Sequence, residues 1–183
     1  FSSRRRHTRL LTVTGVQTCA LPILLDMGMD PFNFADSLLA VLAQRLVRRI
    51  CPKCRQSTPI GADPLQELVH DYLHAWGEAE GRPTAEALVA DWTRRLGVDG
   101  RLMAWRSPGC DHCEQTGVRG RVGLHELLVV SRGVRTLIQT GSRAEQIQAR
   151  AIAEGMRTLR QDGIEKVLMG LTSIEEVRAT SNA

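Results

Sequence analysis

Two pairs of cysteines, Cys51 with Cys54 and Cys110 with Cys113, restrict the folds open to this chain of 183 residues more than any other pattern. Two residues between paired cysteines let both thiolates reach one tetrahedral ion, so two such pairs predict a four-sulfur zinc site. Such a site is closed, with no coordination position left for substrate, and we therefore expect a structural metal. A structural zinc can contribute on the order of 10 kcal/mol to local folding.

Other chemistries remain open for the same cysteines. Iron can occupy four sulfurs as zinc does, and disulfides, redox activity or buried free thiols would also account for paired cysteines. Redox pairs favour a helix N-terminus, whereas Cys51 follows the predicted C-terminus of a helix, which disfavours its thiolate. His112 lies within the second pair and is able to replace one thiolate, but four cysteines make that replacement unnecessary.

The residues around the cysteine pairs carry mostly helical patterns. Apolar side chains repeat at helical spacing across 34–50, and Asp30-Pro31 suits the start of that helix. Residues 55–105, between the pairs, predict an inserted helical hairpin that packs on its own aromatic side chains. Short strands are predicted at residues 102–105 and 121–130. The predicted fold class is therefore mainly α with short β-strands.

These patterns divide the chain into four parts. Residues 1–23 differ from the rest, because they contain four arginines, no acidic residue and no amphipathic period. They look like translated sequencing-adapter read-through, and we expect a non-native leader; a targeting peptide is the alternative. The other parts are the predicted helical segment 24–50, a four-cysteine zinc subdomain 51–130 with the insertion 55–105, and a C-terminal helical subdomain 131–183.

The net charge of +4 does not indicate a nucleic-acid partner. Four of the 24 basic residues lie in the leader, so the rest of the chain has as many basic as acidic residues. Aromatic residues make up only 4%, which argues against a stacking platform for single strands. We therefore expect no nucleic-acid partner.

The sequence also lacks the common catalytic and membrane-spanning patterns. His125-Glu126 begins like the metalloprotease motif H-E-x-x-H, but Val129 occupies the fifth position. Neither a phosphate loop nor a run of eighteen apolar residues occurs among the 183 residues. No catalytic residue is therefore assigned, and Glu126 is expected in a salt bridge or a subunit contact.

Three segments resemble the type II secretion and type IV pilus assembly ATPases. They are LLDMGMDPFNFADSLLAVLAQRLVRRICPKC, then TGVRGRVGLHELL after the second cysteine pair, and GMRTLRQDGIEKVLMGLTSIEEVRAT. The resemblance covers 24–54 and 106–180, and the hairpin 55–105 is where this sequence departs, since most members are expected to have a shorter connection. Within the family, 24–50 resembles the segment that follows the nucleotide site.

The resemblance implies the C-terminal part of a hexameric ATPase whose RecA-like core is missing here. Such an ATPase binds ATP and magnesium in that core and acts peripherally at the cytoplasmic face of the inner membrane. Its implied partners are other copies of the ATPase and the platform and anchor proteins of the secretion or pilus machine. This chain by itself is expected not to hydrolyse ATP, so whether it is an enzyme is left open.

Three further residues are candidates for subunit contacts or coupling through the same resemblance. Gln44 and Arg45 resemble the family's Q-R-L stretch, and Arg135 lies in a segment that resembles its I-R-x-L-I helix. The alternative function is a stand-alone zinc-stabilised protein-interaction module, and a zinc-ribbon nucleic-acid binder is disfavoured by the balanced charge.

Overall fold

The computed structural model describes residues 30–77 and 81–181 of the chain, so the leader 1–23 lies outside the described residues. In chain order the elements are α2 (Pro31–Ser37), β1 (Ala40–Ile50), β2 (Gln56–Pro59), α3 (Ala62–His74), α4 (Ala85–Leu96), β3 (Met103–Arg106), the 3₁₀ turn η1 (Asp111–Cys113), β4 (Val118–Val129), α5 (Arg132–Gln139), α6 (Ala144–Ala153), α7 (Leu159–Leu168) and α8 (Ile174–Thr180). Helices therefore predominate in the described part, as predicted, with four antiparallel strands.

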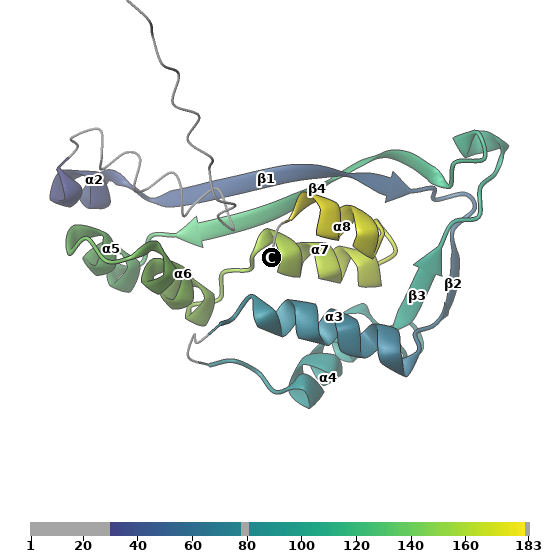
Figure 1. Cartoon of the computed structure of the whole chain (residues 1–183), viewed down its shortest axis with the longest axis horizontal. Coiled ribbons are helices and arrows are strands. Elements are labelled where there is room, and N and C mark those ends of the chain that lie inside the picture. The colour runs from purple at the N-terminus through teal and green to yellow at the C-terminus, as the bar shows by residue number, and fades with distance from the viewer. Residues whose placement is uncertain (1–29, 78–80, 182–183) are drawn as a thin grey trace, which may run out of the picture.

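Strands β1 and β4 form one long antiparallel ladder (Figure 1). Ala40 pairs with Val129 at one end and Arg48 with Arg121 near the other, where a register shift follows. The strand predicted at 121–130 is thus confirmed and begins earlier, at Val118.

The helix predicted across 34–50, and with it a helical 24–50, is wrong. Helix α2 ends at Ser37, and residues 40–50 are strand β1. The error has a physical cause, because β1 is apolar on both faces: Val47 is buried on the inner face, whereas Leu46 is exposed on the outer face. A strand with apolar residues on both faces also has apolar residues at helical spacing, so its sequence fits a helix as well. Pairing with a distant strand then selects the strand.

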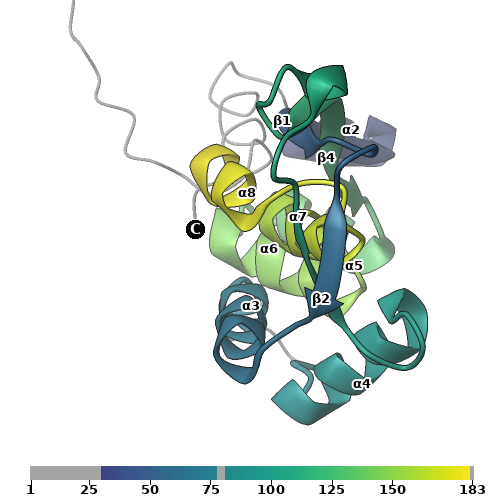
Figure 2. The same cartoon turned by 90° about the vertical axis from the view of Figure 1, so that its right-hand side faces the viewer.

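Helices α3 to α8 lie in two layers beneath the ladder, whereas α2 lies at the end where β1 begins (Figure 1). Figures 1 and 2 show α5 to α8 directly under β1 and β4, with α3 and α4 below them. One buried cluster joins the ladder to α7 and α8 and contains Val47, Leu124, Leu159 and Val177. Another joins α5 and α6 to α2 and the end of β4. Helix α7 therefore lies at the centre of the described fold.

The segment 55–105 contains the two predicted helices, α3 and α4. Tyr72 and Trp92 pack edge to face with ring centroids 5.1 Å apart, so the aromatic contact that the sequence predicted is present. The same cluster also includes Ile164 and Leu168 of α7. The two helices thus pack on α7 as well as on each other.

A short ladder of β2 and β3 connects these helices to the cysteine pairs, with Gln56 opposite Arg106. The short strand predicted at 102–105 is confirmed as β3. Among the described helices, none has both the length and the apolar character that crossing a bilayer requires.

Candidate metal centre

The four paired cysteines come together at the end of the β1–β4 ladder. Their sulfur atoms all lie within 4.8 Å of one another. Cys51 and Cys110 are 3.9 Å apart, Cys54 and Cys113 are 3.9 Å apart, and Cys110 and Cys113 are 3.7 Å apart. Among the described residues, these four form a group whose ligand atoms lie close enough together to hold a metal ion.

The spacing of these sulfurs fits a single tetrahedral ion. Sulfurs about 2.3 Å from zinc form a tetrahedron with edges of about 3.8 Å. A disulfide would need about 2.05 Å between two sulfurs, and all four cysteines are free thiols here. The cluster can therefore hold one metal ion, and its all-sulfur donor set suits zinc.

Backbone geometry holds each pair in place. Cys51 follows β1 directly, and its N–H donates to the Gly117 carbonyl at 2.8 Å. In the second pair, Glu114 and Gln115 take left-handed conformations with φ of 53° and 61°, which turn the chain back sharply toward β4. Gly117 is required there, since a Cβ on it would lie 2.3 Å from the Ser107 carbonyl oxygen.

Hydrogen bonds favour the thiolate of Cys113. Its sulfur accepts N–H groups from Cys110 at 3.2 Å and from Gly117 at 3.3 Å. Burial raises the pKa of this thiol, but the two N–H donors and the neighbouring thiols outweigh burial and bring the pKa to about 7. Burial and the neighbouring thiols raise the pKa of Cys110 to about 11. The pair thus shares its negative charge unevenly.

Ser107 is a neighbour of the site that sequence reasoning missed. Its hydroxyl oxygen lies 3.0 Å from the sulfur of Cys54. Its only sequence signal is its position three residues before Cys110, and that spacing has no established meaning by itself.

His112, considered as a substitute ligand, is half-buried and is not among the four clustered residues. Its backbone carbonyl accepts a hydrogen bond from Arg119. Partial burial lowers the pKa of its imidazole, and the charges of Arg119 and Lys53 lower it further.

The other sequence candidates lie away from this cluster. Gln44 and Arg45 are exposed in the middle of β1, with Gln44 opposite His125 on β4. Arg135 on α5 reaches back to α2, where its Nε donates to the Ala35 carbonyl at 3.2 Å. The structure therefore does not bring these three residues to the cysteines.

Glu126 has a structural position that the sequence did not reveal. Its side chain is buried, and it accepts a hydrogen bond of 3.0 Å from the N–H of Leu159, the first residue of α7. Burial raises the pKa of this carboxyl, and the Leu159 N–H partly opposes that effect. Glu126 thus satisfies a free N–H at the start of the central helix.

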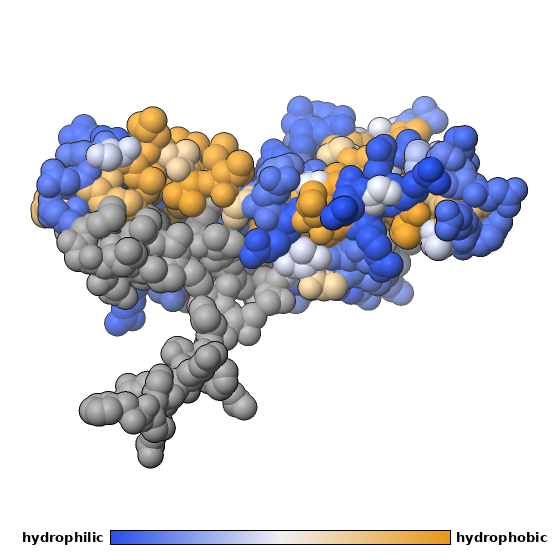
Figure 3. All heavy atoms as spheres, turned by 90° about the horizontal axis from the view of Figure 1, so that it is seen from above, coloured by the Kyte–Doolittle hydropathy of each residue, from blue (hydrophilic) through white to orange (hydrophobic). Residues whose placement is uncertain are grey.

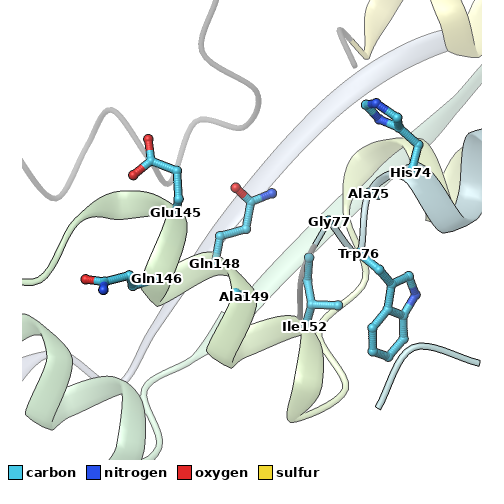
Figure 4. Close-up of a pocket in the computed structure, with 9 residues that line it drawn as sticks. All are labelled: His74, Ala75, Trp76, Gly77, Glu145, Gln146, Gln148, Ala149 and Ile152. Atoms are coloured by element: carbon cyan, nitrogen blue, oxygen red, sulfur yellow. The ribbon is translucent and has the colours of Figure 1, made fainter. Parts of the chain in front are cut away.

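A separate hollow of about 500 Å³ lies between the end of α3 and α6. Figure 4 shows that Glu145, Gln146 and Gln148 come from α6, while His74 and Trp76 come from the α3 end. The three polar side chains of α6 do not converge on a common point (Figure 4). This hollow therefore does not present an arrangement typical of catalysis.

Comparison with known proteins gives matches along most of this chain. The family described as "Type II/IV secretion system protein" matches residues 7–179. The type II secretion system protein E of Aeromonas hydrophila is 41% identical over 152 residues, which cover 83% of this chain and 25% of that protein. The type IV pilus assembly ATPase PilB of Thermus thermophilus is 37% identical over 159 residues, covering 84% of this chain and 15% of that protein.

A third relative extends further along the chain. The type II secretion system protein HxcR of Pseudomonas aeruginosa is 34% identical over 179 residues, covering 97% of this chain and 29% of that protein. The chain thus spans between 15% and 29% of the length of these three relatives. The family match begins at residue 7, so it includes most of the segment 1–23.

Proposed function

This chain belongs to the type II/IV secretion system protein family, and we propose that it is one part of an ATPase that powers protein export or pilus assembly. In this proposal it forms the C-terminal part, and a RecA-like core with the phosphate loop lies in the portion that this chain does not span. ATP and magnesium would bind to that core, so this chain by itself would not hydrolyse ATP. One of the two relatives is named as a secretion protein and the other as a pilus assembly ATPase. These names support export and pilus assembly alike as the process that the ATPase powers.

The outer face of the β1–β4 ladder carries this proposal. We define the outer face by Leu42, Leu46, Leu127 and Val129, which are 59%, 53%, 49% and 61% exposed. Leu42 lies directly opposite Leu127 in the ladder, so the apolar side chains are continuous across both strands. Figure 3 shows apolar atoms gathered over this side of the molecule.

A two-stranded ladder that packs helices on one face is expected to be polar on the other. Strands that are apolar on both faces are typical of sheets covered on both sides, as in α/β proteins. An exposed apolar patch of this kind marks a surface that other polypeptide covers. The remaining three quarters or so of the protein, judged from its relatives, provides such polypeptide.

We further propose subunit contacts through residues exposed on this ladder. The assembly would be a hexamer at the cytoplasmic face of the inner membrane, with the platform and anchor proteins of the machine as partners. Gln44 and Arg45 are exposed midway along β1, where a neighbouring subunit can reach them. Arg135 joins α5 to α2 through the Ala35 carbonyl, so it is placed to transmit movement between those helices.

The metal in this proposal is a structural zinc. Cys51 and Cys54 lie on the arm that follows β1, and Cys110 and Cys113 lie on the arm that precedes β4. Bound zinc would cross-link the two arms, and all four of its positions would be filled by sulfur. Its contribution would therefore be to folding and not to chemistry at a substrate.

Long-read sequencing across the 5′ end of the gene tests the proposal. We expect an in-frame phosphate loop and acidic boxes upstream of Leu24. A genuine start codon that opens the first 23 residues would overturn the proposal. The chain would then be better explained as a stand-alone zinc-stabilised interaction module.

A further inference from the structure

We propose that Ser107 is a positioning residue for the metal centre: its hydroxyl donates a hydrogen bond to the Cys54 sulfur and holds that sulfur in place as a ligand. The contact measures 3.0 Å between Oγ and Sγ. This inference rests on the proposed zinc site and adds to it a residue outside the four cysteines.

The direction of this hydrogen bond follows from the chemistry of metal binding. A cysteine ligates metal as a thiolate, and a thiolate has no proton to donate. The hydroxyl of Ser107 must therefore be the donor whenever metal is bound. Four thiolates around a divalent ion carry two excess negative charges, so each donor to sulfur stabilises the loaded site.

The two cysteine pairs differ in the donors that their backbones supply. In the second pair, Cys113 accepts N–H groups from Cys110 and Gly117. In the first pair, the corresponding N–H of Cys51 donates instead to the Gly117 carbonyl, at 2.8 Å. Among the described residues, and leaving thiol groups aside, the Ser107 hydroxyl is the one donor within hydrogen-bonding distance of the Cys54 sulfur. Ser107 thus supplies what the first pair lacks.

The position of Ser107 is fixed by its surroundings. It directly follows β3, which is paired along its length with β2, and it is partly buried. Its carbonyl lies close against Gly117, where a side chain would collide. Because Ser107 belongs to the arm of the second pair, its bond to Cys54 crosses the site and joins both arms. A donor on a backbone held in this way is placed to orient the sulfur.

Metal titration of the purified chain and its variants tests this assignment, with Zn²⁺ competed by a chromophoric chelator and Co²⁺ as a spectroscopic probe. We expect Ser107→Ala to weaken Zn²⁺ binding about 10-fold to 100-fold, as loss of an outer-shell partner usually does. The Co²⁺–thiolate charge-transfer band should also shift. Ser107→Thr keeps the hydroxyl and should restore both values toward those of the unaltered chain.

Ser57→Ala is the matched control, since Ser57 is an exposed residue of β2 and should leave both values unchanged. Unaltered affinity and an unaltered Co²⁺ spectrum in Ser107→Ala would overturn the role of Ser107. Equal losses in Ser107→Ala and Ser107→Thr would also overturn it, because the hydroxyl would then be irrelevant. Absence of a thiolate band in the unaltered chain would instead overturn the proposed metal site itself.

Discussion

The indole N–H of Trp105 donates a hydrogen bond of 2.9 Å to the backbone carbonyl of Leu168, the last residue of α7. Arg55 donates in the same way to the Gly170 carbonyl at 3.0 Å, and the N–H of Ile50 donates to the Leu171 carbonyl at 3.1 Å. Carbonyls at a helix C-terminus otherwise lack partners. The arms that carry the cysteines therefore satisfy the end of the central helix, and the two regions should unfold together.

Replacing Gly170 by alanine should disturb this junction. Gly170 has φ of +68°, and a Cβ there would lie 2.4 Å from the ring of Trp105. Gly141→Ala is the matched control, because Gly141 has φ of +65° with no atom within 4 Å. We expect the control to lose about 1 kcal/mol in urea unfolding and Gly170→Ala to lose about 2–4 kcal/mol. Equal losses would show that the Trp105 contact is unimportant.

The double variant Cys51→Ser/Cys110→Ser should lose bound metal. It removes one sulfur from each pair, so neither the closed site nor either complete pair remains. Elemental analysis should find about one zinc per unaltered chain and none in the double variant. Cys19→Ser, which changes the one cysteine of the sequence outside the two pairs, should retain the metal. Metal retained by the double variant would contradict the assignment.

Glu165 should contribute more to stability than any exposed acid of the chain. Its carboxylate is only 3% exposed and accepts from Arg95 at 3.0 Å and from Arg157 at 2.9 Å. Glu165→Gln removes the countercharge of Arg157 and one of the two carboxylates that Arg95 contacts, the other being Asp91 at 2.6 Å, and we expect a loss of about 3 kcal/mol in the free energy of unfolding. Glu176→Gln breaks a pair with Arg48, which is 67% exposed, and should cost less than about 1 kcal/mol. Similar losses would refute this ranking.

The hydroxyl of Tyr72 should ionise at a higher pH than an ordinary tyrosine. Tyr72 is the single tyrosine of the sequence, so the tyrosinate absorbance reports on this residue alone. Burial raises the pKa of its hydroxyl to about 12, with a further contribution from the charge of Glu165. Since the folded pKa exceeds the unfolded value of about 10, the folded state holds the proton more tightly. The contribution of Tyr72 to the free energy of unfolding should thus be fully present below pH 10. The free energy of unfolding should then fall by about 2–3 kcal/mol as the pH rises toward 12.

Absorbance at 295 nm measures this ionisation directly. The midpoint should lie near pH 12 in the folded chain and return to about pH 10 in concentrated urea. A midpoint near 10 in the folded chain would mean that Tyr72 is accessible to water.

The outer face of the ladder should tolerate polar substitution better than the inner face. Leu42 is 59% exposed, whereas Leu124 on the opposite face is fully buried. We expect Leu42→Ser to cost less than about 1 kcal/mol and to reduce self-association, measured by light scattering. Leu124→Ala should cost about 2–5 kcal/mol because it leaves a cavity. A large loss in Leu42→Ser would indicate that Leu42 already packs within this chain.

Local patterns were sufficient for much of this protein. The C-x-x-C spacing predicted that Cys51, Cys54, Cys110 and Cys113 would meet, because the preference of metal ions for paired thiolates is visible in a few residues. Helices α3 and α4 also followed from their own periodicity, since each is apolar mainly on one side, and the strand β4 followed from a strand-like stretch that begins among closely spaced glycines. Family membership followed from three long segments read together.

Only the tertiary structure decided the rest. Residues 40–50 are apolar on both faces, so their periodicity fits a helix or a strand, and the hydrogen bonds of β4 select the strand. Glu126 beneath α7 and Ser107 beside Cys54 depend on partners 33 and 53 residues away. Such contacts have no signature in a single sequence, because folding and not spacing along the chain brings the two groups together.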